Sequence, residues 1–176
     1  MDKIKLVAIL RGIQPAEAAD HIETLINAGF RYIEIPLNSP DWQQSIPAMV
    51  RQFGERAMIG AGTVLKVEQV DFLAEAGAKL IVTPNTAPAV IRRAVDKGML
   101  VCAGCATASE AFSALKAVLP PEVPVLAVGG VTPESLATWI QAGCAGAGLG
   151  SDLYRAGQAV ERTREQAERF ISASKS

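Results

Sequence analysis

The sequence is poor in the residues that mark several common classes of protein. Aromatic residues make up 5% and charged residues 20% of the 176 residues, and the formal net charge is only −1. Nothing in this composition favours binding to nucleic acid or to an anionic membrane. No apolar stretch approaches the length of a membrane span, and no signal-peptide core follows the first residues. We therefore expect a cytoplasmic protein with neither a nucleic-acid nor a membrane partner.

Cysteine and histidine are also scarce. Cys102, Cys105 and Cys144 are an odd number without secretory context, so a disulfide framework is not expected. Cys102 and Cys105 stand where a redox pair can sit, between a strand and a helix, although the Ala-Gly between them also suits a tightly packed strand. The single histidine, His21, is expected to face solvent. These residues cannot complete a four-ligand zinc site, so we expect neither a metal nor a cofactor.

What the chain does contain is a repeated pattern of short apolar runs. Each run is apolar on both faces and closes with glycine or a polar turn residue, which is typical of buried parallel strands. Seven such runs stand at residues 7–12, 32–36, 59–63, 80–85, 100–104, 125–130 and 144–150.

Helical patterns lie between these runs. Apolar residues spaced for one buried face predict helices over residues 15–28, 67–76, 88–97, 132–142 and 156–171. Alternation of strand and helix predicts a single α/β domain over residues 1–176, built as a parallel TIM-type barrel. Such barrels have eight strands, whereas this chain offers seven. A doubly wound sheet is disfavoured because no G-x-G-x-x-G turn follows the first strand. The fifth strand is expected beside the strand at 125–128, either paired with it or separated by a slot.

One carboxylate stands inside a predicted strand. Alternation places Glu34 on the face opposite Ile33 and Ile35, which in a barrel is the inner face near the mouth. Desolvation there raises the pKa of a carboxyl group and suits it to proton transfer. The structural alternative is a Glu34 that only pairs with Arg11 of the neighbouring strand.

The last two strands end in glycine-rich turns. Gly129 and Gly130 precede a predicted helix, and Gly150 and Ser151 end the final strand. Barrels often bind phosphate with the loops after their last two strands, through free backbone N–H groups. Ordinary tight turns are the alternative for each pair, but two pairs on consecutive last strands favour phosphate.

Six blocks of the sequence carry a family resemblance. They read AILRG at 8–12, EIPLNSP at 34–40, IGAGTVL at 59–65, VTPN at 82–85, AVGGVTPE at 127–134 and GLGSDLYR at 148–155. Together they resemble the bacterial 2-keto-3-deoxy-6-phosphogluconate / 6-phosphogalactonate aldolases. The versions at 36–40 and 127–130 are similar to the phosphogalactonate branch.

The resemblance implies a function and a set of roles. The family is an (α/β)₈ barrel, usually trimeric, that performs class I aldol chemistry without a metal or other cofactor. The reaction implied is the reversible cleavage of 2-dehydro-3-deoxy-6-phosphogalactonate to pyruvate and glyceraldehyde 3-phosphate. By resemblance Glu34 is the general acid/base. The other roles implied are contact with the substrate by Arg11, Thr63 and Pro84, and contact with its phosphate by Gly129, Gly130 and Ser151.

The family's Schiff-base lysine has no counterpart in this sequence. That lysine lies on the sixth strand in a Lys-Ile/Phe-Phe-Pro motif, which is absent here. Residues 110–115 resemble the start of the family's fifth helix, and 116–120 resemble the end of its sixth, so one β-α unit is missing at Leu115-Lys116. Lys66 is the one other lysine expected near the mouth, and it lacks apolar surroundings that would depress its pKa.

Three functions follow as hypotheses. The first is the aldolase reaction itself, and the second is a non-catalytic remnant that binds phospho-sugar acids or assembles with an intact aldolase. The third is a lysine-free enzyme that uses Glu34 for proton abstraction, which is disfavoured because nothing visible would stabilise the enolate. The missing amine predicts that this chain forms no Schiff base with pyruvate.

Overall fold

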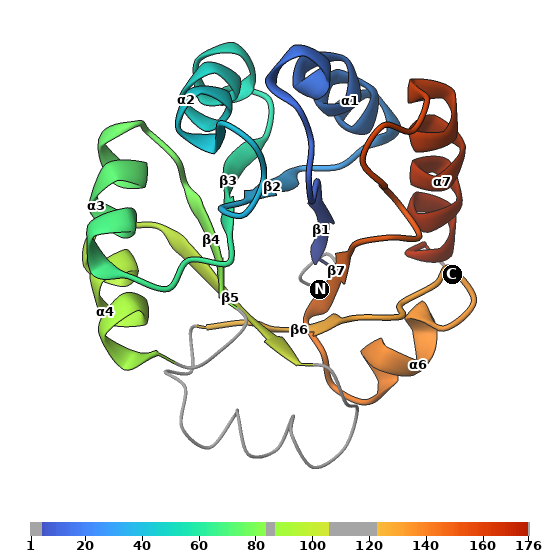
Figure 1. Ribbon diagram of the computed structural model, residues 1–176. Coiled ribbons are helices and arrows are strands. Elements are labelled where there is room, and N and C mark those ends of the chain that lie inside the picture. The colour runs from blue at the N-terminus through green and yellow to red at the C-terminus, as the bar shows by residue number, and fades with distance from the viewer. Residues whose placement is uncertain (1–4, 84–86, 106–122, 176) are drawn as a thin grey trace.

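Seven parallel strands form a closed barrel (Figure 1). The structure is a computed structural model that describes residues 5–83, 87–105 and 123–175, and the side chains of all but 103–105 among them. The strands are β1 (Lys5–Ile9), β2 (Tyr32–Pro36), β3 (Met58–Gly62), β4 (Leu80–Thr83), β5 (Leu100–Cys105), β6 (Val125–Val128) and β7 (Gly146–Leu149). The prediction of a seven-stranded parallel barrel is confirmed.

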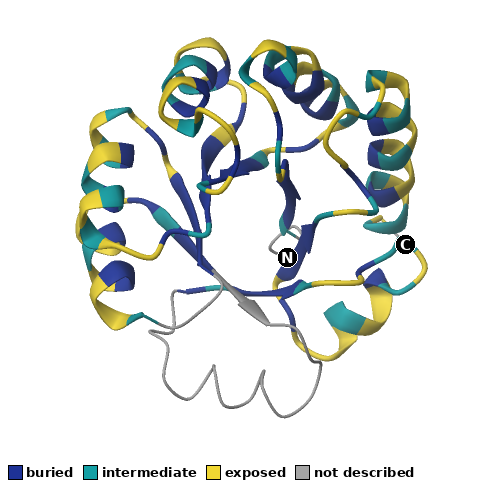
Figure 2. Ribbon diagram, in the orientation of Figure 1, coloured by how far each residue is buried: buried dark blue, intermediate teal, exposed yellow. Residues whose placement is uncertain are grey.

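Helices surround the strands, and each helix buries one apolar face against them (Figures 1 and 2). They are α1 (Pro15–Ala28), α2 (Trp42–Phe53), α3 (Val67–Glu75), α4 (Pro88–Asp96), α6 (Leu136–Gln141) and α7 (Val160–Ala173). Residues 110–120, which resemble parts of two helices of the family, lie outside the described residues. No helix within the described ranges has the length and apolar content that crossing a bilayer requires.

Two strand pairs decide whether the barrel is closed: β5 with β6, and β1 with β7. β5 pairs directly with β6, with Gly104 opposite Leu126, so the two strands are paired rather than separated by a slot. β1 pairs with β7, with Lys5 opposite Gly146. Every strand therefore has two neighbours, and no strand in the ring has a free edge.

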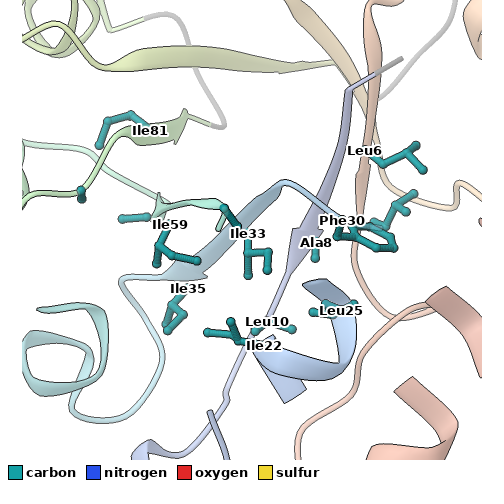
Figure 3. Close-up of a cluster of buried hydrophobic side chains, with 14 of the residues drawn as sticks. Leu6, Ala8, Leu10, Ile22, Leu25, Phe30, Ile33, Ile35, Ile59 and Ile81 are labelled. Atoms are coloured by element: carbon teal, nitrogen blue, oxygen red, sulfur yellow. The ribbon is translucent and has the colours of Figure 1, made fainter. Parts of the chain in front are cut away.

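Two apolar clusters lie on the two faces of the barrel wall. The larger one fills the space between strands and helices, where Leu10 and Ile35 lie close to Ile22 of α1 (Figure 3). The smaller one lies inside the ring and contains Val7 and Cys102. Burial on both faces explains why the strands are apolar throughout instead of alternating with polar residues.

Glycine replaces larger residues where strands come closest on the inner face. A Cβ atom at Gly60 would overlap the carbonyl oxygen of Leu80, and one at Gly146 would overlap the carbonyl oxygen of Lys5. No other residue fits these positions without moving backbone. The inner glycines thus allow a ring of seven strands to close tightly.

Two helices begin later than the sequence predicts. The helix expected from residue 132 begins at Leu136, because Thr132 and Ser135 cap a preceding turn: the N–H of each donates to the hydroxyl of the other, at 2.9 and 3.2 Å. The helix expected from residue 156 begins at Val160, because Gly157 has a φ of 74°, which a right-handed helix cannot contain.

The expectation that His21 faces solvent is wrong. His21 is buried, and its Nδ1 lies 2.8 Å from the hydroxyl oxygen of Thr163 on α7. Burial lowers the pKa of His21, with desolvation as the largest cause. The residue lies on the same side of α1 as Ala18 and Leu25, because helical positions three and four residues apart share a face.

Candidate active site

The predicted site residues gather at the carboxyl ends of the strands. Arg11 follows β1, Glu34 lies near the end of β2, and Thr63 follows β3. Gly129 follows β6 and Ser151 follows β7. Parallel barrels carry their chemistry at this end, where the loops that follow the strands meet.

Glu34 is buried at the inner face of the barrel wall, with 2% of its surface exposed. Desolvation raises the pKa of its carboxyl group to about 8, against the opposing effects of the Arg11 charge and a hydrogen bond from the backbone N–H of Gly62. Its Oε2 has no hydrogen-bond partner among the described residues. A carboxyl group that holds its proton near neutral pH and has a free oxygen is suited to moving a proton.

Arg11 acts on Glu34 through charge and not through a direct contact with Oε2. The Arg11 side chain is exposed, and none of the ion pairs in the described part of the chain includes it. The purely structural interpretation, in which Glu34 exists to pair with Arg11, is therefore not supported. The guanidinium group remains available for an anion.

Gly62 makes room for the carboxyl group of Glu34. A Cβ atom at this position would overlap the Glu34 carboxyl oxygens. The small residue at the end of β3 is therefore required by the site, because only glycine at position 62 leaves space for the Glu34 side chain of β2 on the inner face.

Thr63 follows immediately in an uncommon backbone conformation. Its φ is 58°, in the left-handed region that a β-branched residue rarely adopts. Such strain persists where the surroundings hold it, and it is frequent at functional sites. Thr63 is half-buried at the mouth. Pro84, the third residue expected to contact substrate, lies outside the described residues.

A cavity of about 150 Å³ brings the three predicted phosphate residues together with Arg11. Gly129 and Gly130 have φ values of 96° and 63°, which favour glycine, and a Cβ atom on either would meet nothing within 4 Å. The cavity is also lined by Ile9, Val128, Val131, Gly148, Gly150, Ser151 and Asp152. Open space beside exposed backbone N–H groups and a guanidinium is the geometry an anion requires.

Sequence reasoning missed a residue that holds the mouth together. The N–H of Gly12 donates to the hydroxyl of Ser39, at 3.0 Å, and Ser39 is buried. This bond ties the loop after β1, which carries Arg11, to the loop after β2. The signal available was the Pro-bounded block at 36–40, whose rigidity hinted at a fixed loop without naming its partner.

No described lysine lines this cavity. Lys66 is exposed at the start of α3, where the Gln69 side chain accepts its backbone N–H at 3.0 Å. Lys79 lies at the opposite end of the barrel, in a hollow with Arg31 and Met58. Lys116 lies outside the described residues.

A larger cavity of about 460 Å³ lies away from these groups. Its lining includes Leu6, Phe30, Tyr32 and Lys175, which belong to the amino-terminal ends of the strands and the end of α7. Size alone does not make it the site of chemistry, because in parallel barrels that end contributes stability.

Cys102 does not support the redox interpretation. It lies buried inside the ring, and burial raises the pKa of its thiol to about 12. A neutral buried thiol is a poor nucleophile. The side chain of Cys105 lies outside the described residues.

Comparison with known proteins is consistent with this geometry. The 2-dehydro-3-deoxy-6-phosphogalactonate aldolase of Escherichia coli (strain K12) is 60% identical over 194 aligned residues, which cover 97% of this chain and 95% of that protein. The alignment is longer than this 176-residue chain, so the relative carries residues that this chain lacks. This agrees with the absence of one β-α unit.

Solved structures give the same picture. A structure described as native KDPGal superposes with a TM-score of 0.88 at 58% identity, covering 99% of this chain and 96% of that chain. A chain of a cube-shaped, porous cage designed by fusing symmetric oligomeric domains has a TM-score of 0.88 at 59% identity, covering 98% of this chain and 73% of that chain. The family described as KDPG and KHG aldolase matches residues 1–120. The chain belongs to the KDPG and KHG aldolase family.

Proposed function

We propose that this chain carries the substrate site of a 2-dehydro-3-deoxy-6-phosphogalactonate aldolase. The reaction is the reversible cleavage of that sugar acid to pyruvate and glyceraldehyde 3-phosphate. The proposal rests on one observation: a buried Glu34 that holds its proton lies at the same end of the barrel as the anion cavity.

Glu34 is the general acid/base in this proposal. Aldol cleavage breaks the bond between the carbon next to the carbonyl group and the carbon that bears a hydroxyl group. One proton must leave that hydroxyl group, and another must be added to the carbon that becomes the methyl group of pyruvate. A carboxyl group with a pKa of about 8 can do both near neutral pH. Arg11, Thr63 and Pro84 contact the keto-acid end of the substrate.

The phosphate end lies in the cavity formed by the last two turns. Gly129, Gly130 and Ser151 contact the phosphate, and Arg11 lines the same cavity. The glycine turns present backbone N–H groups to the anion, and the charge of Arg11 adds an attraction that phosphate and carboxylate share.

A second candidate is a non-catalytic member of the family that binds phospho-sugar acids or assembles with an intact aldolase. The placement of the described lysines favours it, because none lines the cavity near Glu34. Class I cleavage needs an amine that forms an iminium and withdraws electrons as the carbon–carbon bond breaks. General acid/base catalysis alone supplies only about 10²–10⁴-fold.

One experiment separates the two candidates. The protein is incubated with pyruvate and borohydride, and its intact mass is measured together with cleavage in a coupled assay. We expect phosphate binding to be retained, which supports the proposed substrate site, but no adduct and no cleavage, because the amine is missing; that result favours the non-catalytic candidate. A stable adduct would support the aldolase reaction, and peptide mapping would name the lysine.

The assembly and cellular site follow from the same proposal. We expect a cytoplasmic homotrimer that handles a phosphorylated keto-deoxy sugar acid and pyruvate. The chain similar to this one in a cage of fused symmetric oligomeric domains supports an oligomer. Sedimentation equilibrium at several concentrations measures its size, and a monomer would contradict the expectation.

A further inference from the structure

We propose that Tyr154 and Glu17 are positioning residues for the phosphate end of the substrate, because their hydrogen bond holds together the two loops that form the anion cavity. This inference rests on the proposed function, since it takes phosphate as the occupant of that cavity. Neither side chain lines the cavity itself.

The two loops come from opposite ends of the chain. Arg11 stands between β1 and α1, whereas Ser151 stands between β7 and α7, yet both line one cavity. The loops touch directly: a Cβ atom on Gly12 would lie 3.2 Å from the Cβ of Ala156. A shift of one loop therefore changes the shape of the cavity wall on the other side.

Tyr154 links the second loop to α1. Its N–H donates to the carbonyl oxygen of Gly150 at 2.9 Å, and its hydroxyl donates to Glu17 Oε1 at 2.8 Å. The same Glu17 oxygen accepts the N–H of Gln14 at 3.3 Å, which closes the first turn of α1. Tyr154 thus bonds to the carboxylate that fixes where the helix after Arg11 begins.

Packing around Tyr154 leaves it little freedom. The phenol ring is buried and meets His21 edge-on, with ring centroids 5.1 Å apart. His21 in turn contacts Thr163, whose hydroxyl oxygen accepts a bond from Gln158 Nε2 at 2.7 Å. Gln158 Nε2 also donates to the carbonyl oxygen of Leu153 at 3.0 Å. Leu153 lies on the same loop as Ser151, so these hydrogen bonds connect α1 and α7 to the loop that lines the cavity.

The hydroxyl of Tyr154 remains a donor at ordinary pH. Burial and the neighbouring carboxylate of Glu17 both raise its pKa. A hydrogen bond from a neutral hydroxyl to a half-buried carboxylate such as that of Glu17 is stronger than one between neutral groups, because the acceptor is charged. Its loss leaves the two loops joined by van der Waals contact alone at this point.

The test compares Tyr154→Phe, which removes only the hydroxyl, with the unaltered protein. Amide hydrogen exchange is measured without ligand, and inorganic phosphate and pyruvate are then titrated while amide NMR signals are followed. We expect exchange at Gly12 and Leu153 to accelerate at least about threefold, and phosphate to bind about five- to tenfold more weakly. Pyruvate binding should weaken less than phosphate binding, because Arg11 is the one proposed contact of the keto-acid end that stands on either loop, whereas Thr63 follows β3.

Four further variants sharpen the result. Ser174→Ala removes a hydroxyl that bonds the carbonyl oxygen of Ile171 near the other end of α7, and it should change neither exchange at Gly12 nor phosphate binding. Glu17→Gln keeps an acceptor oxygen and should retain most phosphate affinity, whereas Glu17→Ala, which also loses the bond from Gln14, should weaken phosphate binding at least as much as Tyr154→Phe. The double variant Glu17→Ala/Tyr154→Phe should lose no more than Glu17→Ala alone.

Unchanged exchange at Gly12 in Tyr154→Phe would overturn the inference, and so would equal weakening of phosphate and pyruvate. The proposed function has a separate readout: phosphate must shift the amide signals of Gly129 and Gly130 in the unaltered protein. If it does not, the proposed function fails, while the exchange comparison still decides whether Tyr154 holds the two loops together.

Discussion

At the scale of single residues, the proton on Glu34 links stability to pH. Its pKa rises from an ordinary value of 4.5 to about 8 on folding, so the folded state binds this proton more tightly than the unfolded state. The stabilisation is therefore complete below pH 4.5 and is lost as the pH rises toward 8. This slope is opposite to that of an ion-paired carboxylate such as Asp71, whose pKa is lowered by its hydrogen bond with Arg93.

Glu34→Gln should remove this pH dependence. We expect the free energy of unfolding of the unaltered protein to fall, relative to the variant, by up to about 1.4 kcal/mol for each pH unit between the two pKa values. Urea unfolding of both proteins from about pH 5 to about pH 9 measures the difference. Curves that run parallel over this range would show that Glu34 is ionised in the folded state. His21 is present in both proteins, so its contribution to the pH dependence cancels.

At the scale of elements, the strands were predictable because they are apolar on both faces and end in turn residues. The residues at their carboxyl ends, Arg11, Glu34 and the glycine pairs, followed from that placement alone. The start of α7 was not predictable, because it depends on the conformation of Gly157. Contacts between distant elements were equally hidden: Thr163, the partner of His21, lies 142 positions along the chain.

The turn after β6 offers a prediction at this scale. Gly130→Ala should lower the free energy of unfolding by about 1–2 kcal/mol, because alanine is strained at a φ of 63°. Gly130 also lines the anion cavity, so a methyl group added there should weaken phosphate binding. Calorimetric titration with phosphate and urea unfolding measure the two effects.

Gly98→Ala is the matched control for that variant. Gly98 has a φ of 70° and open space for a Cβ atom, but it lies between α4 and β5, away from the cavity. It should cost similar stability and leave phosphate binding intact. Equal loss of phosphate binding in both variants would show that strain, and not occupation of the cavity, is responsible.

At the scale of the whole molecule, β5 pairs directly with β6 at the place where the family resemblance implies another strand. Inserting between Leu115 and Lys116 the residues that the Escherichia coli relative carries and this chain lacks should separate β5 from β6. We expect the enlarged protein to give a borohydride-stable adduct with pyruvate, detected as a mass increase. The same insert with arginine in place of its lysine should give none. A folded insert that carries the lysine but no adduct would contradict the expectation.

Closure of the barrel between β1 and β7 has a consequence for synthesis on the ribosome. β7 ends at Leu149, so one edge of β1 has no strand to pair with until most of the chain has been translated. At about 5–20 residues per second, that interval is on the order of ten seconds. Throughout it the nascent chain presents an apolar strand with unpaired N–H and C=O groups, a template for pairing with other chains. Pairing of β1 with other chains therefore competes with correct closure of the barrel until β7 has been made.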